Sequence, residues 1–357
     1  MSLISEKRPA FSPELISYLA EHCTEPELLS LALLDRSFRA CVLPILYRNI
    51  QLRAYENALA FCNTVRASME FLGSYTRVLD IRLYEEPDVE LGDLSEDEDK
   101  AERQERLMLA AANKRGDRRL GNALAAALSV MVDLAHLTLD IWREGVFGPI
   151  FTPTRLAYPF TLKSLGIQVL GQDGFMTFLQ QQSHIEELEV AWGWNVNHRE
   201  FRESNRCDLP PEVLPRLRNL RIESNPLVGL RLIRNRPVST LALGVSIGHS
   251  EDPELGRLVQ QGSVPLTCLR LSMSGPPQQV NLFLASLISA FDSCLHCLKD
   301  LTIVAGREGT GRDWLNDIVQ LTDTELVKSK IKHFSALESF KLEVPWDAAA
   351  DDEDDSQ

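Results

Sequence analysis

Apolar residues recur along the chain in a six-residue pattern, L-x-x-L-x-L, with Leu, Ile, Val or Phe at its three apolar positions. Residues 217–222, LRNLRI, form one copy. The last two apolar positions alternate with other residues, which predicts a short strand with both apolar side chains on one face. Nine copies occur, with apolar positions at Val78/Ile81/Leu83, Leu134/Leu137/Leu139, Leu162/Leu165/Ile167, Ile185/Leu188/Val190, Leu217/Leu220/Ile222, Val238/Leu241/Leu243, Leu266/Leu269/Leu271, Leu298/Leu301/Ile303 and Leu337/Phe340/Leu342.

The spacing of these copies predicts a repeat array. Successive copies start between 21 and 56 residues apart, and most steps are near the roughly 20–29 residues of a leucine-rich repeat. Burying three aliphatic side chains stabilises one copy by roughly 5–9 kcal/mol, whereas ordering some 25 residues costs on the order of 25–50 kcal/mol in backbone freedom. A single copy therefore cannot fold alone, and stacked copies must share a core.

The array is expected to be irregular, because only the fifth copy carries the asparagine, Asn225, that completes the leucine-rich-repeat pattern. Helical segments are predicted between the copies at 120–134, 276–298 and 311–334. The sequence thus favours an α/β fold, an irregular leucine-rich-repeat solenoid with a parallel sheet and helices behind it. The alternative interpretation is an ordinary α/β domain in which leucines alternate by chance.

Three short helices are predicted at the N-terminus. Ser12 can cap the first, with Pro13 at its first position, and Thr24 and Glu27 form a capping-box pattern at the second. Asp35 can cap the third. A unit this small leaves apolar surface uncovered, and such surface commonly marks a partner site. Its apolar residues include Leu15, Ile16, Leu19, Leu28, Leu31 and Leu33.

This segment resembles the F-box, in the F-box-like version that opens many fungal leucine-rich-repeat proteins. The resemblance covers about 42 residues, from Phe11 to Leu52. It is carried by four pieces in order: Pro13-Glu14-Leu15-Ile16, Leu28-Leu29-Ser30-Leu31, Arg36-Ser37-Phe38-Arg39 and Pro44-x-Leu46-Tyr47-Arg48.

The resemblance implies a role in ubiquitination. F-box proteins dock through this segment onto a Skp-type adaptor, which joins them to a cullin–RING ubiquitin ligase, and the domain that follows recruits a protein substrate. By position, the adaptor-binding residues implied here are Pro13, Leu15, Ile16, Leu19, Leu28 and Leu31. Any of these could instead pack the three helices together. The alternative function is a non-catalytic leucine-rich-repeat scaffold whose helical segment only caps the solenoid.

Charge defines two further segments. The chain has 37 basic and 51 acidic residues, a net charge of −14, and the excess lies in the stretch 84–106 and the tail 347–357. High charge and low hydrophobicity predict disorder for both. The F-box-like helical domain is assigned to 9–52 and the repeat array to 53–346. The body outside the acidic segments is close to neutral, so nucleic-acid binding is not expected.

No motif points to catalysis or to a cofactor. The chain lacks the metalloprotease, nucleophile-elbow and phosphate-loop signatures. The glycine-rich 306–312 lacks the phosphate-loop lysine, and Cys294-x-x-Cys297 has no second pair of zinc ligands. We therefore expect neither an enzyme nor a metal site.

A polar surface remains as the site for a substrate. Residues that flank the second core position of each strand face away from the helices and are mostly polar or charged. Tryptophan and arginine are frequent in binding hot spots, although a tryptophan in a long loop can also merely cover the rim. The candidate substrate-binding residues are Trp142, Trp192, Trp194, Arg221 and Arg270.

Location follows from two expected absences. The longest apolar run is too short to cross a bilayer, and no signal peptide is recognised at the start. Seven cysteines without framework spacing suggest reduced thiols. We expect an intracellular protein, in the cytoplasm or the nucleus, that does not bind membranes.

Overall fold

The described residues of the computed structural model are 11–68, 72–83, 100–141, 144–152, 158–169, 173–192, 210, 212–223, 229–246, 254–274, 295–306 and 334–343. Several predictions lie outside them: Trp142, Trp194, Asn225, most of the helices predicted at 276–298 and 311–334, the acidic stretch 84–99 and the tail 347–357.

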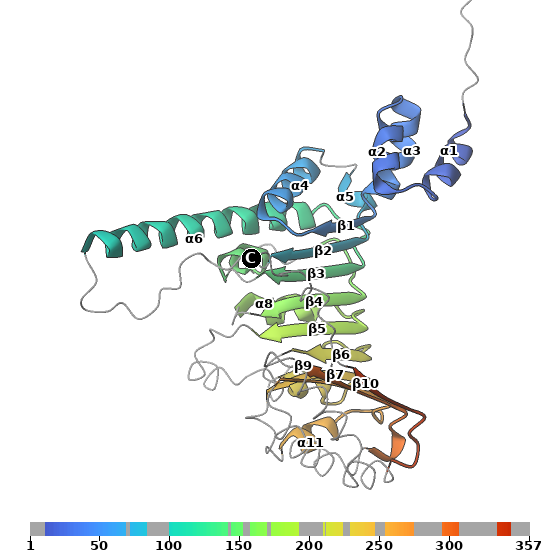
Figure 1. Cartoon of the computed structure of the whole chain (residues 1–357), viewed down its shortest axis with the longest axis vertical. Helices are drawn as coiled ribbons and strands as arrows, with labels where there is room; N and C mark the ends of the chain where they lie inside the picture. Colours follow the sequence, from blue (N-terminus) through green and yellow to red (C-terminus); the bar gives the residue numbers. More distant parts are fainter. Residues whose placement is uncertain are drawn as a thin grey trace, which may run out of the picture. The chain divides into compact units, whose positions relative to one another are not determined.

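Ten β-strands are ordered in the sheet as they follow one another along the chain (Figure 1). Every described pairing is parallel. The predicted α/β class with a parallel sheet is therefore confirmed, and each of the nine copies coincides with a strand from β2 to β10. The strands are β1 Asn49–Leu52, β2 Val78–Leu83, β3 His136–Ile141, β4 Ser164–Val169, β5 Glu187–Trp192, β6 Asn219–Ile222, β7 Thr240–Ser246, β8 Cys268–Ser274, β9 Asp300–Gly306 and β10 Ser339–Glu343.

The chain divides into two compact units. Met1–Lys163 and Gln172–Phe178 form the first, which contains β1–β3, whereas Ser164–Gly171 and Leu179–Gln357 form the second, which contains β4–β10. The described helices are α1 Pro13–Ala20, α2 Glu25–Ala32, α3 Arg36–Leu46, α4 Tyr55–Ala67, α5 Leu72–Tyr75, α6 Lys100–Leu128, α7 Glu144–Ile150, α8 Asp173–Gln181, α11 Glu254–Val259, and the short 3₁₀ turns η2 Arg231–Ile233 and η4 Leu295–Cys297.

Helix α6 corrects the predicted extent of the acidic disorder. Disorder is predicted for 84–106, yet α6 begins at Lys100, so residues 100–106 are helical. This stretch, KAERQER, is rich in good helix formers. Local helix propensity therefore outweighs high charge at this point.

Parallel register stacks the apolar positions of the copies into rows. Two rows cross the second unit and are almost completely buried, except at the last strand, where Phe340 is 36% exposed. The buried members are Leu165, Leu188, Leu220, Leu241, Leu269 and Leu301 in one row, and Ile167, Val190, Ile222, Leu243, Leu271 and Ile303 in the other. One face of the strands thus forms the core, as the alternation predicts.

The first copy is framed wrongly in the sequence pattern. Strand β2 places Leu79 opposite Leu137 of β3. The counterpart of buried Leu134 is therefore Thr76, not Val78, and the triplet Val78/Ile81/Leu83 is displaced by two residues. Thr76 is fully buried, and its hydroxyl donates to the carbonyl of Leu72 at 3.4 Å. A search pattern that accepts only apolar residues misses this alignment. The first position of the copy is held by a threonine, which can be buried because its hydroxyl is hydrogen-bonded.

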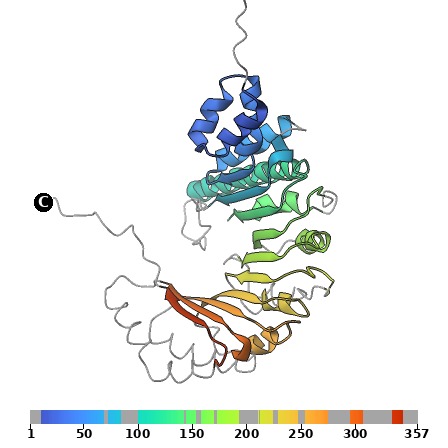
Figure 2. The same cartoon turned by 90° about the vertical axis from the view of Figure 1, so that its right-hand side faces the viewer.

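The backbone just before seven of the described strands repeats one hydrogen-bond arrangement. The carbonyl of Arg48 accepts the N–H groups of both Arg77 and Val78, each at 3.0 Å. The same double acceptance recurs at the carbonyls of Arg77, Glu186, Arg218, Ser239, Thr267 and Lys299. Strands joined in this way start level with one another, and from β3 to β9 the apolar residue ahead of the strand is buried in the core. Figure 2 views the strands of the first unit from the side where they begin.

A buried arginine organises the segments around β6 and β7. Arg236 is fully buried in the second unit. Its guanidinium donates to the carbonyls of Val213 at 2.8 Å, Leu232 at 2.9 Å and Pro210 at 2.9 Å. These carbonyls belong to the turn before β6 and to η2. One side chain therefore satisfies backbone acceptors from two segments that would otherwise be buried without donors.

Replacing Arg236 tests this role. We expect Arg236→Met to lower the free energy of unfolding of the second unit by about 3 kcal/mol, because the carbonyl groups lose their donors. Exposed Arg234→Met, the matched control, should change it by less than about 0.5 kcal/mol. Urea denaturation followed by circular dichroism measures both. Equal transition midpoints for the two variants would contradict the assignment.

Candidate protein-docking surface

Capping residues determine where the first two helices begin. Ser12 caps α1, its hydroxyl oxygen accepting the N–H of Leu15 at 3.3 Å, and Pro13 takes the first helical position. The Glu27 carboxylate of α2 accepts the backbone N–H of Thr24 at 2.7 Å and its hydroxyl at 2.8 Å. These bonds, the backbone one foremost, hold the pKa of Glu27 below its usual range. The predicted starts of both helices are confirmed.

The third helix completes a small helical unit. Asp35 caps α3 by accepting the N–H groups of Ser37 at 2.7 Å and Phe38 at 3.0 Å. Three buried residues, Ala20, Leu28 and Val42, form the centre of the cluster between the helices. Partly buried side chains packed against them are Cys23, Leu31, Ala32, Ile45 and Leu46. The core is small, since two of its eight residues, Ala20 and Ala32, are alanines.

Helices α1 and α2 each have a second, outward apolar side. On α1, Leu15, Tyr18 and Leu19 are 44%, 62% and 45% exposed. Their spacing, i, i+3 and i+4, places them on one face, which we call the α1 apolar face. Exposed apolar residues of α2 and the turn after it, which we call the α2 apolar face, are Leu29 at 53%, Leu33 at 86% and Leu34 at 65%. Soluble proteins usually cover such clusters with a partner.

The structure separates the six residues implied to bind the adaptor. Pro13, Leu15 and Leu19 are exposed. Ile16 and Leu28 are buried inside the helical unit, and Leu31 is half-buried against its core. The prediction did not include Tyr18, Leu29, Leu33 and Leu34, which complete the exposed faces. Counting three and four residues onward from Leu15 and Leu29 would have found Tyr18 and Leu33.

Packing ties these helices to the first unit. Helix α3 contacts both β1 and α5, and the ring of Tyr47 stacks on that of Phe61 of α4 with 6.2 Å between centroids. Figure 1 shows α1 to α3 grouped beyond β1. The contacts are made through α3, so the outward sides of α1 and α2 stay open.

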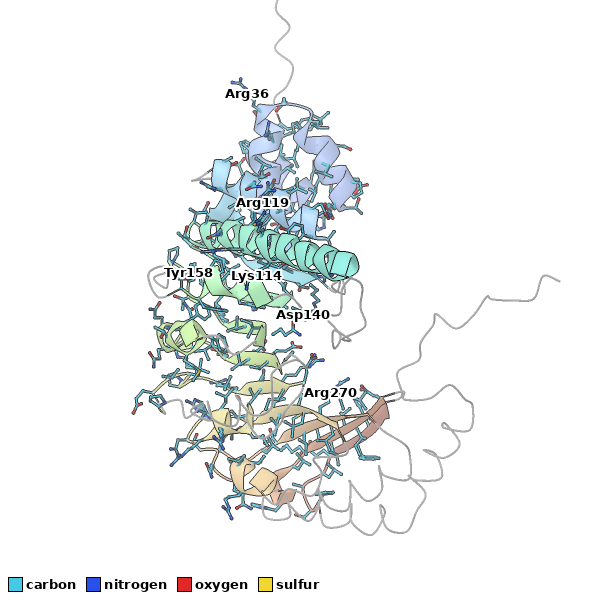
Figure 3. All side chains as sticks on the ribbon, turned by 90° about the vertical axis from the view of Figure 1, so that its left-hand side faces the viewer. Arg36, Lys114, Arg119, Asp140, Tyr158 and Arg270 are labelled. Atoms are coloured by element: carbon cyan, nitrogen blue, oxygen red, sulfur yellow. The ribbon has the colours of Figure 1, made fainter. Side chains whose placement is uncertain are left out.

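A second candidate surface is the open face of the sheet in the second unit. Register places Arg221 of β6 and Arg270 of β8 in one row, with the small Ala242 of β7 between them. Arg221 pairs with Glu189 at 3.4 Å and with Glu223 at 2.8 Å. Arg270, labelled in Figure 3, reaches across β9 to Glu343 of β10 at 2.8 Å. The other substrate candidate within the described residues, Trp192, is the last residue of β5.

The open face of the first unit is organised by one carboxylate. Asp80 of β2 accepts Arg53 at 2.8 Å and Arg82 at 3.0 Å. Burial by itself would raise the pKa of Asp80, but the two arginine hydrogen bonds and their charges outweigh it and lower the pKa. The cluster therefore links the end of β1 to β2 through charge-assisted bonds.

Comparison with known proteins does not assign the chain to a family. No protein-family model matches the chain, and a search of curated proteins found no match. Within the described residues, no three His, Cys, Asp or Glu side chains gather as a metal site. None of the described helices combines the length and the apolar character that a membrane span requires.

The Asp80 cluster predicts a pH-dependent stability. A carboxyl whose pKa is lowered in the folded chain stabilises it above the unfolded pKa of about 3.9, and that contribution is lost as the pH falls through the folded pKa. We expect Asp80→Asn to lower the free energy of unfolding by about 1 kcal/mol at pH 7 and by progressively less below about pH 4. Thermal unfolding across this pH range, with Asp133→Asn as the exposed control, measures the difference. A gap that persists at pH 2 would contradict the cause.

Proposed function

We propose that the chain is the substrate-recognition subunit of a Skp–cullin–F-box ubiquitin ligase. The F-box-like helices α1 to α3 dock a Skp-type adaptor, and the strands that follow form an irregular leucine-rich-repeat solenoid whose open face recruits a protein substrate. The chain itself performs no catalysis in this proposal. It joins two proteins, so that a ligase bound at one surface acts on a substrate bound at another.

One observation carries the docking role. The α1 and α2 apolar faces are exposed on helices whose opposite sides already form a core. These leucines are 44% to 86% exposed, and a partner that buried the exposed part of each would add up to roughly 1.5 kcal/mol per side chain. These residues lie in the segment that resembles the F-box. A protein with a matching apolar groove is the partner that this arrangement fits.

The order of the strands supports the repeat array. Neighbouring strands in the sheet are consecutive in the chain, and each copy of the sequence pattern supplies one strand. In an array of this kind each copy packs only on its neighbours, and the face opposite the helices stays free for ligands. The exposed row with Arg221 and Arg270 lies on that face, which is why we assign substrate binding to it.

A scaffold role is the second candidate, and the packing of α3 favours it. Because α3 contacts β1 and α5, the helical unit can serve as a cap on the first strands without any adaptor. Capping uses the inner sides of the helices. Only the docking role uses the α1 apolar face, so substitutions there separate the two functions.

Binding to a purified Skp-type adaptor tests the proposal. We expect the whole chain to bind and Leu15→Asp/Leu19→Asp to weaken binding by about 100-fold or more, because two leucines that the adaptor would bury are lost. Both side chains are exposed in the free chain, so the fold should persist. Isothermal titration calorimetry gives the affinities.

Val132→Asp/Val264→Asp is the matched control. It places two carboxylates at exposed aliphatic positions outside the helical unit, 50% and 39% exposed, and should bind the adaptor like the unchanged chain. Circular dichroism checks the fold of each variant. If the unchanged chain fails to bind the adaptor, or if the α1 variant binds equally well, the adaptor role is lost and the scaffold role stands.

A further inference from the structure

Helix α6 carries four exposed cations close together. Lys114, Arg115, Arg118 and Arg119 are all exposed. Successive residues of an α-helix are about 100° apart around its axis, so these four side chains cover an arc of roughly 140°. We call this side of the helix the α6 basic face. Lys114 and Arg119 are labelled on α6 in Figure 3. The buried side of the helix, with Leu120 and Leu124, lies on the remaining arc.

No described side chain neutralises this face. None of the four cations forms an ion pair or a side-chain hydrogen bond with another described residue. The one acidic residue among them, Asp117, is turned toward α7, where a Cβ placed on Gly145 would lie 2.7 Å from its Cβ. The like-charged pairs Lys114–Arg118 and Arg115–Arg119 are each four residues apart, which disfavours the helix by itself.

The α6 basic face is held in a fixed position. Beyond it, Leu120, Leu124 and Leu128 are fully buried, and α6 packs against α4 and α7. A Cβ placed on Gly121 would lie 2.3 Å from the carbonyl oxygen of Val146, so the two helices approach closely there. The hydroxyl of Tyr55 donates to the carbonyl of Gly116 at 2.7 Å, beside the cations. The cations thus extend from an anchored part of the helix.

We propose that the α6 basic face binds an acidic segment of a partner polypeptide. Three planar guanidinium groups and one ammonium present charge-assisted donors to carboxylates. An extended strand repeats on one side about every 6.8 Å, and the face extends about 7.5 Å along the helix, so two or three carboxylates of one peptide can reach it. The proposal does not depend on the N-terminal helices or their adaptor.

The charge of the whole chain favours a peptide over a nucleic acid. A net charge of −14 repels a long polyanion, and four cations are fewer than the roughly 6–10 phosphate contacts of typical DNA binders. A short acidic peptide lies within one screening length of the face, about 8 Å at physiological salt, and avoids most of that repulsion.

Fluorescence anisotropy of a labelled octaglutamate peptide with the full chain tests the proposal. We expect binding that weakens as salt rises from 50 to 200 mM, as it does between exposed charges. We expect a loss of about 10-fold or more in K114Q/R115Q/R118Q/R119Q, because glutamine keeps helix propensity and removes the charges. The control R36Q/R39Q/R216Q/R234Q removes four exposed cations elsewhere and should bind within about twofold of the unchanged chain.

Four results would overturn the proposal. One is no binding by the unchanged chain, and another is an equal loss in the two quadruple variants, which would indicate net charge alone. A third is tighter, face-dependent binding of a single-stranded RNA, which would assign the face to nucleic acid. The last is that the peptide binds only to a variant in which the carboxylates between Glu85 and Asp99 are replaced by amides. That result would mean that the chain's own acidic stretch occupies the face. Circular dichroism confirms that each variant is folded.

Discussion

Shared burial of two aliphatic side chains per strand is the constraint on which the sheet depends. The rows from Leu165 to Leu301 and from Ile167 to Ile303 are buried only because each strand lies level with its neighbours. A slip by one residue would turn every apolar side chain to the open face and every charged one into the core. The doubly accepting carbonyls before the strands prevent this slip.

The N-terminal helices are limited by how few residues can form their core. Their inner sides must make a core from few residues, and that core is small because α1 contributes Ala20 and α2 contributes Leu28, Leu31 and Ala32. Packing of α3 on β1 supplies the support that the core lacks. The leucines on the outer sides are more exposed than the residues of that core, which is why we propose that this short structural segment also serves as a docking surface.

Strands were more predictable from the sequence than surfaces. Alternation of two apolar residues is set by backbone geometry, so the nine copies located nine strands, and caps such as Ser12 and Thr24 located helix starts. The burial of Thr76 was not predicted, because a polar residue can be buried only where the fold supplies a hydrogen-bond acceptor, here the carbonyl of Leu72. The burial of Arg236 was not predicted for the same reason, since the carbonyls that accept its hydrogen bonds, at Val213 and Leu232, are 23 and 4 residues away in the chain. For the residues proposed to dock a partner, the resemblance to the F-box could not separate Ile16, which is buried, from neighbouring Leu15, which is exposed.

The doubly accepting carbonyl before seven of the strands also limits where residues can be inserted. An extra residue between that carbonyl and its strand would break both bonds and push the aliphatic pair out of line with the next. Added length is harmless only beyond the carboxyl end of a strand, and the starts of successive copies already differ in spacing from 21 to 56 residues. Those ends are where an engineer could graft a foreign epitope or a whole domain and leave the architecture intact.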